Sequence, residues 1–192
     1  MSTIMTPRQP PVFNVPNQLT AARFVLAIVL FALIEYRLWV PCIGIFALAA
    51  ITDWLDGYLA RKQGLTSTLG RNLDPLVDKV LICGTFVFLV PVQSAGVYAW
   101  MVTVVVSREL IITSLRSFLE NRGANFGADW LGKIKMVLQC AALFAIFLAL
   151  QIPDVTILFW TRNALIYAML AATALSGLQY LWRAAQLFRK DE

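Results

Sequence analysis

Four aspartates lie close together in a chain that carries few charges. Asp53 and Asp56 are three residues apart, and Asp74 and Asp78 are four residues apart. If both segments are helical, each pair shares one helix face, and two neighbouring helices could direct all four carboxylates to one place. Four carboxylates in a low-dielectric environment repel one another unless protons or cations neutralise them. Two divalent cations would balance the four negative charges.

The ligand atoms also indicate which cations to expect. The chain has no His, and no Cys lies near the four aspartates, so the expected ligands are oxygens alone. Oxygen ligands favour hard ions such as Mg²⁺ or Mn²⁺ over zinc. A pair of such ions is typical of enzymes that act on phosphates, because it can bind a pyrophosphate and stabilise the charge of the transition state.

A single aspartate near a helix end is more often a solvated cap or an ion-pair partner. Arg61 and Lys79 are available as such partners. Four acids on two helix faces are less easily explained in this way, since buried acids are costly in membrane segments and usually functional. We therefore interpret the four aspartates as a metal site.

The composition predicts the elements that position these acids. The chain of 192 residues is 59% hydrophobic and 14% charged, with a mean hydropathy of +0.72, which is typical of an integral membrane protein. Each crossing helix needs about 20 apolar residues, which leaves room for roughly six. We expect an all-α fold with a short cytoplasmic segment at 1–16 and one membrane domain at 17–192. Its expected helices span 19–36, 39–62, 72–91, 97–120, 131–151 and 158–186.

Lys and Arg predict the orientation. With both termini in the cytoplasm, fourteen of the sixteen basic residues face that side, and only Arg37 and Arg162 face outward. This bias fits the positive-inside rule and places the four aspartates at the cytoplasmic face of the inner membrane. The net charge of +5 is explained by the same surface and gives no reason to expect nucleic acid.

The aspartates belong to a longer pattern that resembles a known family. Asp53-x-x-Asp56-Gly57-x-x-Ala60-Arg61, eight further residues and Gly70-x-x-x-Asp74-x-x-x-Asp78 are similar to the signature of the CDP-alcohol phosphotransferases. Three more stretches resemble its phosphatidylglycerophosphate synthase branch, which uses CDP-diacylglycerol and glycerol 3-phosphate: "NVPNQLTAARF" at 14–24, "SRELIITSLR" at 107–116 and "GKIKMVLQ" at 132–139.

The resemblance implies a six-helix membrane enzyme, usually a homodimer, with a two-metal site that opens to the cytoplasm. It would transfer the phosphatidyl group of CDP-diacylglycerol to glycerol 3-phosphate and release CMP. By the same analogy Asp53 and Asp74 contact both ions, Asp56 contacts one, and Asp78 contacts the other and acts as general base.

Further positions match substrate-binding residues of the family. Gly57, Arg61 and Ser67 match residues that hold the CDP part of the lipid, and a guanidinium such as that of Arg61 can pair bidentately with phosphate. The amino-terminal stretch that helps to close the nucleotide pocket is matched by Asn17, Thr20 and Arg23. A polar helix start is the ordinary alternative for that stretch.

The expected acceptor site depends on three basic residues. Arg108, Arg116 and Lys135 match the acceptor-phosphate pocket of similar enzymes, although the positive-inside rule alone would also place cations there. Arg108 is the best candidate because it interrupts an apolar run. Glu109 points about 100° away from Arg108 on a helix and is not expected to be its partner. An alternative ion-pair seam could follow the stripe of Glu109, Thr113, Arg116 and Glu120.

Three alternative functions remain at this point. The same chemistry with another acceptor would give a cardiolipin, phosphatidylserine or phosphatidylinositol-phosphate synthase. Membrane prenyltransferases also bind pyrophosphates through Asp-rich metal sites, but their chains are longer and lack the Gly57 to Gly70 pattern. A divalent-cation transporter would place acids near mid-membrane on several helices rather than at one end of two.

Overall fold

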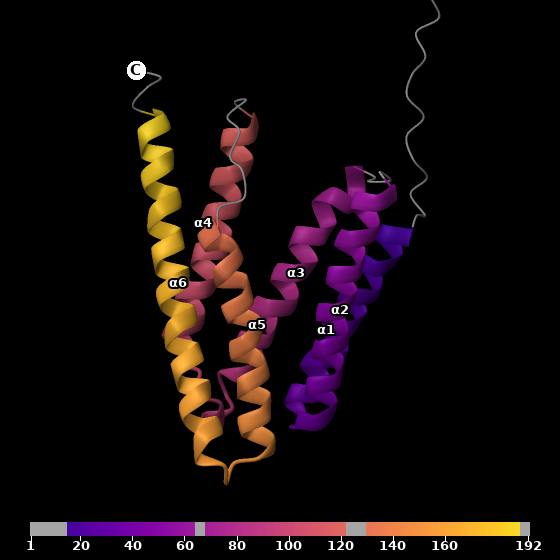
Figure 1. The fold of residues 1–192 in the computed structure, drawn as a ribbon, viewed down its shortest axis with the longest axis vertical. Coiled ribbons are helices and arrows are strands. Elements are labelled where there is room, and N and C mark those ends of the chain that lie inside the picture. Colours follow the sequence, from indigo (N-terminus) through magenta and orange to yellow (C-terminus); the bar gives the residue numbers. More distant parts are fainter. Residues whose placement is uncertain (1–14, 64–67, 122–129, 189–192) are drawn as a thin grey trace, which may run out of the picture.

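The computed structural model describes residues 15–63, 68–121 and 130–188, and this part of the chain is helical throughout apart from short connections (Figure 1). The all-α prediction is thus confirmed. A short 3₁₀ turn, η1 (Gln93–Ala95), precedes the fourth of six α-helices. The helices are α1 (Val15–Glu35), α2 (Trp39–Gln63), α3 (Thr68–Leu89), α4 (Ala99–Asn121), α5 (Trp130–Gln151) and α6 (Thr156–Phe188).

Most helix boundaries lie within two residues of the prediction. The exceptions are α1 and α3, which each begin four residues earlier than expected, at Val15 and Thr68. Hydropathy marks only the apolar part of a helix, whereas a polar first turn extends beyond it. Pro75 lies within α3, where it removes one backbone donor.

Three of the described helices are long and apolar enough to cross a bilayer. These segments are Gln18–Glu35, Trp130–Gln151 and Thr156–Gln186, and Trp39–Thr52 in α2 is a shorter apolar helix. Large apolar side chains on their outer faces, such as those of Val137 and Ile157, are exposed. Such a surface suits lipid rather than water, so the chain has the character of a membrane protein.

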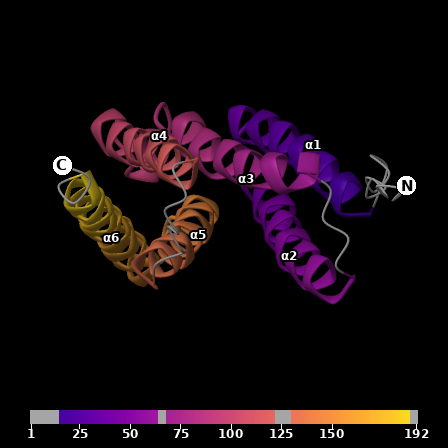
Figure 2. The same cartoon turned by 90° about the horizontal axis from the view of Figure 1, so that it is seen from above.

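The helices form two groups that meet through α3 and α5 (Figures 1 and 2). In the first group α1 packs against both α2 and α3, and in the second α6 packs against α4 and α5. Contacts of α3 with α4 and α5, and of α2 with α5, join the groups. Gly84 allows α1 and α3 to approach closely, because a Cβ there would lie 2.3 Å from Cζ of Phe31. Phe31 in turn stacks on Phe88 at a centroid distance of 4.9 Å.

The ends of the helices divide between two ends of the molecule. The start of α1, the end of α2, the start of α3 and the end of α6 lie at one end (Figure 1). The turn between α1 and α2, the η1 turn and the connection from α5 to α6 lie at the other end.

Candidate active site

The four aspartates lie on the two helices that the sequence predicted. Asp53 and Asp56 belong to the carboxyl-terminal part of α2, while Asp74 and Asp78 belong to the first half of α3. The described side chains include that of Asp78 alone among the four. Convergence of all four carboxylates therefore stays a prediction. Among the residues whose side chains are described, no group of three or more Cys, Asp or Glu could hold a metal.

Asp78 forms an ion pair that ties α3 to α1. Nη1 of Arg23 donates to Oδ1 of Asp78 at 2.7 Å. The Arg23 side chain is completely buried, whereas 24% of the Asp78 side chain is exposed. Thr20, one turn before Arg23, is also buried. Arg23 was expected to help close the nucleotide pocket, and its contact with Asp78 gives it a position beside the proposed catalytic acid.

A small cavity opens between α3, α4 and α5. Its volume is about 170 Å³, and its polar lining comes from Asp78 and Lys79 of α3, Glu109 of α4, and Lys135 and Gln139 of α5. The cavity therefore brings a proposed metal ligand and a proposed acceptor-binding cation to one space.

A second cavity lies on the other side of Asp78. It has a volume of about 290 Å³ and is lined by Arg23, Asp78 and mostly apolar side chains of α2, α3 and α5. Asp78 thus stands between a polar cavity and an apolar one. A substrate with one polar and one apolar part could reach Asp78 from both.

Glu109 joins two of the cations proposed for the acceptor phosphate. Its buried Oε1 accepts hydrogen bonds from Nζ of Lys135 and, at 3.2 Å, from Nη1 of Arg108. The expectation that Glu109 does not pair with Arg108 is wrong. Helix geometry sets the Cα–Cβ directions 100° apart, but the long Arg side chain turns back far enough to reach its neighbour.

The ion-pair seam expected along α4 is described only in part. The hydroxyl of Thr113 donates to the backbone carbonyl of Glu109 at 2.6 Å and accepts from Nζ of Lys79 on α3. The printed ion pairs of Glu109 run to Arg108 and Lys135. The side chain of Glu120 lies outside the described residues. The described part of the stripe therefore links α4 to α3 and α5, and pairing of Arg116 with Glu120 stays a prediction.

Two residues of α6 hold the arginines of α4, and sequence reasoning missed both. Nη2 of Arg108 donates to Oγ of Ser176 at 3.0 Å, and Nη2 of Arg116 donates to the hydroxyl of Tyr180 at 2.9 Å. Both guanidinium groups also lie over the Tyr180 ring, at 5.7 and 5.6 Å from its centroid. The available signal was the spacing of four between two polar residues in an apolar helix, which puts them on one face.

Three buried donors of this region have no hydrogen-bond acceptor in the described part of the chain. They are Nε of Arg108, Nε of Arg116 and Nε2 of Gln139. A buried donor without an acceptor is costly, and such groups in native structures usually bind a water, an ion or a ligand. The region is therefore suited to an anion that accepts several hydrogen bonds.

The proposed CDP-binding residues are less fully described. Gly57 and Arg61 lie on α2, and Asn17 lies on α1, but the side chains of Arg61 and Asn17 are outside the described set. Ser67 falls outside the described residues altogether. Of this group, only Thr20 has a described side chain. Their assembly into one pocket stays a prediction.

Comparisons with known proteins identify the family of the chain. The CDP-alcohol phosphatidyltransferase family profile matches residues 13–178. A CDP-diacylglycerol–glycerol-3-phosphate 3-phosphatidyltransferase of Bacillus subtilis is 36% identical over 183 residues, covering 88% of this chain and 93% of the relative. A protein of the same name from Salmonella typhimurium is 34% identical over 179 residues, with 88% and 93% covered. Because the match spans nearly the whole chain, including both aspartate helices and the α4–α5 cations, the chain belongs to the CDP-alcohol phosphatidyltransferase family.

Proposed function

We propose that the protein transfers the phosphatidyl group of CDP-diacylglycerol to glycerol 3-phosphate, giving phosphatidylglycerophosphate and CMP. The observation that carries this proposal is the cavity shared by Asp78 and Lys135, in which an acid meets a cation suited to an acceptor phosphate. The names of the relatives from Bacillus subtilis and Salmonella typhimurium support the same donor and acceptor.

The four aspartates would hold two divalent cations, Mg²⁺ or Mn²⁺. The donor set fits such ions, because carboxylate oxygens are their preferred ligands. Asp53, Asp56, Asp74 and Asp78 would be the residues that hold them. When bound, the ions would neutralise the pyrophosphate of the donor and the charge on departing CMP. Gly57, Arg61, Ser67, Asn17 and Thr20 would bind the CDP part of the lipid.

Asp78 is the proposed general base. Its carboxylate would take the proton from the 1-hydroxyl of glycerol 3-phosphate, and the alcohol oxygen would then attack the lipid-attached phosphorus in line. The bond from that phosphorus to the oxygen that it shares with the CMP phosphate breaks, and CMP is the leaving group. Arg23 fixes the carboxylate through its 2.7 Å contact, so Asp78 is held in one orientation when the hydroxyl arrives.

Lys135, Arg108 and Arg116 would bind the acceptor phosphate. Lys135 and Arg108 share the single carboxylate of Glu109, while Arg116 is held by the neutral hydroxyl of Tyr180. Among the described side chains, the ion pairs of these three cations all run to one carboxylate, that of Glu109. The Nε donors of both arginines are buried without acceptors among the described residues, and phosphate oxygens would supply those acceptors.

The membrane arrangement follows from the same proposal. All six helices would cross the inner membrane, with both termini and the active site on the cytoplasmic side, and two copies would form a homodimer. The cytoplasmic excess of Lys and Arg and the even number of helices support this topology.

A direct assay tests the function. Purified protein would be incubated with CDP-diacylglycerol, Mg²⁺ and one acceptor at a time: glycerol 3-phosphate, serine, inositol phosphate or phosphatidylglycerol. CMP release and the lipid product would be measured, with the Asp78→Asn variant as the inactive control. We expect CMP and phosphatidylglycerophosphate when glycerol 3-phosphate is the acceptor, and no CMP with the other acceptors. A preference for another acceptor would reassign the substrate, and absence of CMP with every acceptor would exclude this enzyme function.

A further inference from the structure

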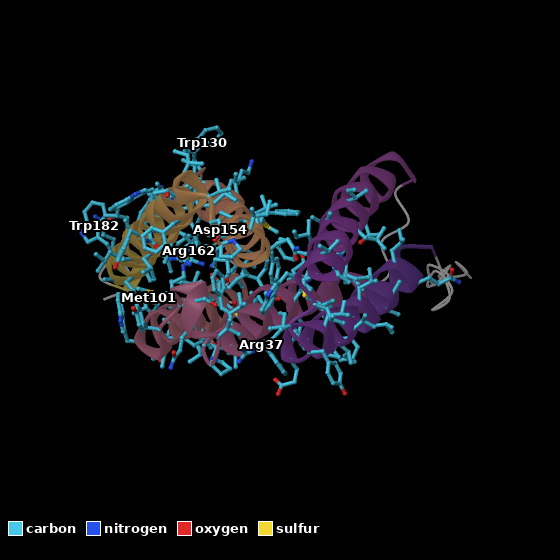
Figure 3. All side chains as sticks on the ribbon, turned by 90° about the horizontal axis from the view of Figure 1, so that it is seen from below. Arg37, Met101, Trp130, Asp154, Arg162 and Trp182 are labelled. Carbon is cyan, nitrogen blue, oxygen red and sulfur yellow. The ribbon has the colours of Figure 1, made fainter. Side chains whose placement is uncertain are left out.

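A buried arginine lies at the end of the molecule opposite the candidate active site. Arg162 belongs to the second turn of α6 and is only 6% exposed. Figure 3 views the molecule from this end and labels Arg162 together with Asp154 of the connection from α5 to α6. The other basic residue expected at this end, Arg37, is exposed. A buried guanidinium is costly unless something compensates its charge.

The described partners of Arg162 are all neutral. Nη1 donates to the backbone carbonyl of Ser94, while Nε and Nη2 donate to Oδ1 of Asn163 at 3.1 and 2.9 Å. The guanidinium also lies over the ring of Phe159, 4.7 Å from its centroid. Within the described ranges, no carboxylate lies within 4.0 Å of Arg162. The charge is therefore hydrogen-bonded but not neutralised.

The backbone of the η1 turn is adapted to this arginine. Gly96, directly after η1, has a φ of 70°, a left-handed conformation that glycine adopts readily. A Cβ at this position would lie 3.2 Å from Cζ of Arg162. The turn thus comes into close contact with the guanidinium. This contact fixes the position of the guanidinium beside a cavity.

A cavity of about 360 Å³ opens beside Arg162. Its lining combines polar side chains with exposed apolar ones at the connection from α5 to α6. The polar part includes Gln93, Tyr98 and Tyr167, and the apolar part includes Ile152 and Val155. The cavity therefore has a buried positive charge and hydrogen-bonding groups on one part of its lining and exposed apolar side chains on another.

We propose that this cavity binds the phosphate of an anionic lipid headgroup from the outer leaflet. The phosphate would supply the negative charge that Arg162 lacks, in the paired geometry that guanidinium and phosphate oxygens favour. Tyr98, Tyr167 and Gln93 would donate further hydrogen bonds. The apolar side chains of Ile152 and Val155 favour a lipid over free phosphate, since they give the acyl chains a surface to contact. This site is separate from the proposed catalytic one and does not depend on its chemistry.

Arg162 also has a structural role, because it joins α6 to the η1 turn through Ser94. Asn163→Asp separates the two roles. The new carboxylate would retain both hydrogen bonds to Arg162 and neutralise its charge. The hydrogen bond of Arg162 to the η1 turn would remain, but the electrostatic attraction between Arg162 and a lipid phosphate would be lost. Arg162→Gln removes the charge entirely, and Arg37→Gln is the matched control at the same end of the molecule.

The experiment measures the melting temperature of each purified variant in detergent, with and without added lipid. The probes are dioleoyl phosphatidylglycerol, dioleoylglycerol without a phosphate, and inorganic phosphate. For the wild-type protein and Arg37→Gln, phosphatidylglycerol at about ten times its dissociation constant should raise the melting temperature by about 3–6 °C, and dioleoylglycerol should not. This rise should be lost in Arg162→Gln and in Asn163→Asp, and the latter should melt no lower than wild type without lipid.

Each other outcome contradicts the proposal. An equal rise in wild type and Asn163→Asp would show that the lipid binds elsewhere. An equal rise with inorganic phosphate would reassign the site to a free anion, and no rise in wild type would leave Arg162 a structural residue only. If Arg162→Gln does not fold, Asn163→Asp still decides between these outcomes.

Discussion

Replacing Glu109 by Gln tests whether this residue organises the acceptor-binding cations. The change keeps the size of the side chain and removes its charge. The side chains of Glu109 and Lys135 are only 10% and 8% exposed, so solvent screens their interaction little. Removing one partner of a buried pair costs roughly 3–5 kcal/mol, and the amide oxygen can still accept one hydrogen bond, which favours the lower value. A loss of about 3 kcal/mol corresponds to a fall in melting temperature of roughly 6–12 °C for a chain of this size.

The same change should affect the acceptor more than the donor. Without the carboxylate, Lys135 and Arg108 repel each other. One of them is then displaced from the position in which it would bind the acceptor phosphate. One charge-assisted hydrogen bond is worth about 1.5–3 kcal/mol, so kcat/KM for glycerol 3-phosphate should fall about 10- to 100-fold. The KM for CDP-diacylglycerol should remain close to the wild-type value.

Steady-state CMP release with each substrate varied in turn measures both constants. Glu35→Gln is the matched control, because Glu35 is exposed at the end of α1. An unchanged melting temperature together with an unchanged kcat/KM for glycerol 3-phosphate would refute the role of Glu109. Equal effects on both substrates would indicate a general loss of structure instead.

Four further changes have expected outcomes. Asp78→Asn should lower CMP release at least about 100-fold because the general base is lost, while circular dichroism should still report a helical protein. Chelation by EDTA should stop CMP release and added Mg²⁺ or Mn²⁺ should restore it; release that persists in EDTA would exclude the metal proposal. Arg108→Lys should raise the KM for glycerol 3-phosphate about tenfold, since one ammonium cannot reach Ser176 and the acceptor phosphate together. Gly84→Ala should destabilise the protein by about 1–3 kcal/mol, seen as a lower melting temperature, because the new methyl group overlaps the Phe31 ring.

The helices were predictable because long apolar runs mark them in the sequence. All six lie where the apolar runs placed them, and the differences occur where a helix continues beyond its apolar part. In α3 the residues from Thr68 to Arg71 form no apolar run, yet they are helical because their backbone bonds continue the same helix. A hydropathy profile does not detect helical turns that lie outside an apolar run. The turn between α3 and α4 likewise depends on Gly96 and Arg162, which are distant in sequence.

The site was predictable in its charges but not in its contacts. Arg108, Arg116 and Lys135 could be proposed because cations in apolar runs are unusual. Their partners on α6 could not, since only tertiary packing brings Ser176 and Tyr180 to α4. The error on Glu109 has the same origin. Backbone geometry gives the direction of the Cα–Cβ bond. The charged group of a long side chain can lie far from that direction, beside a nearby opposite charge.

The division of charge between the two helix groups explains why the contact of α3 with α5 matters for catalysis. The first group supplies all four proposed metal ligands, and the second supplies the three cations proposed for the acceptor phosphate. Neither group could complete the reaction alone, because the donor would bind to one and the acceptor to the other. The polar cavity lies where they meet, with Asp78 on α3 and Lys135 on α5. With Asp78 as the proposed base and Lys135 as a proposed acceptor ligand, the packing between these two helices would set the distance between the attacking hydroxyl and its base. Substitutions that separate α3 from α5 should therefore slow transfer even when every proposed ligand is intact.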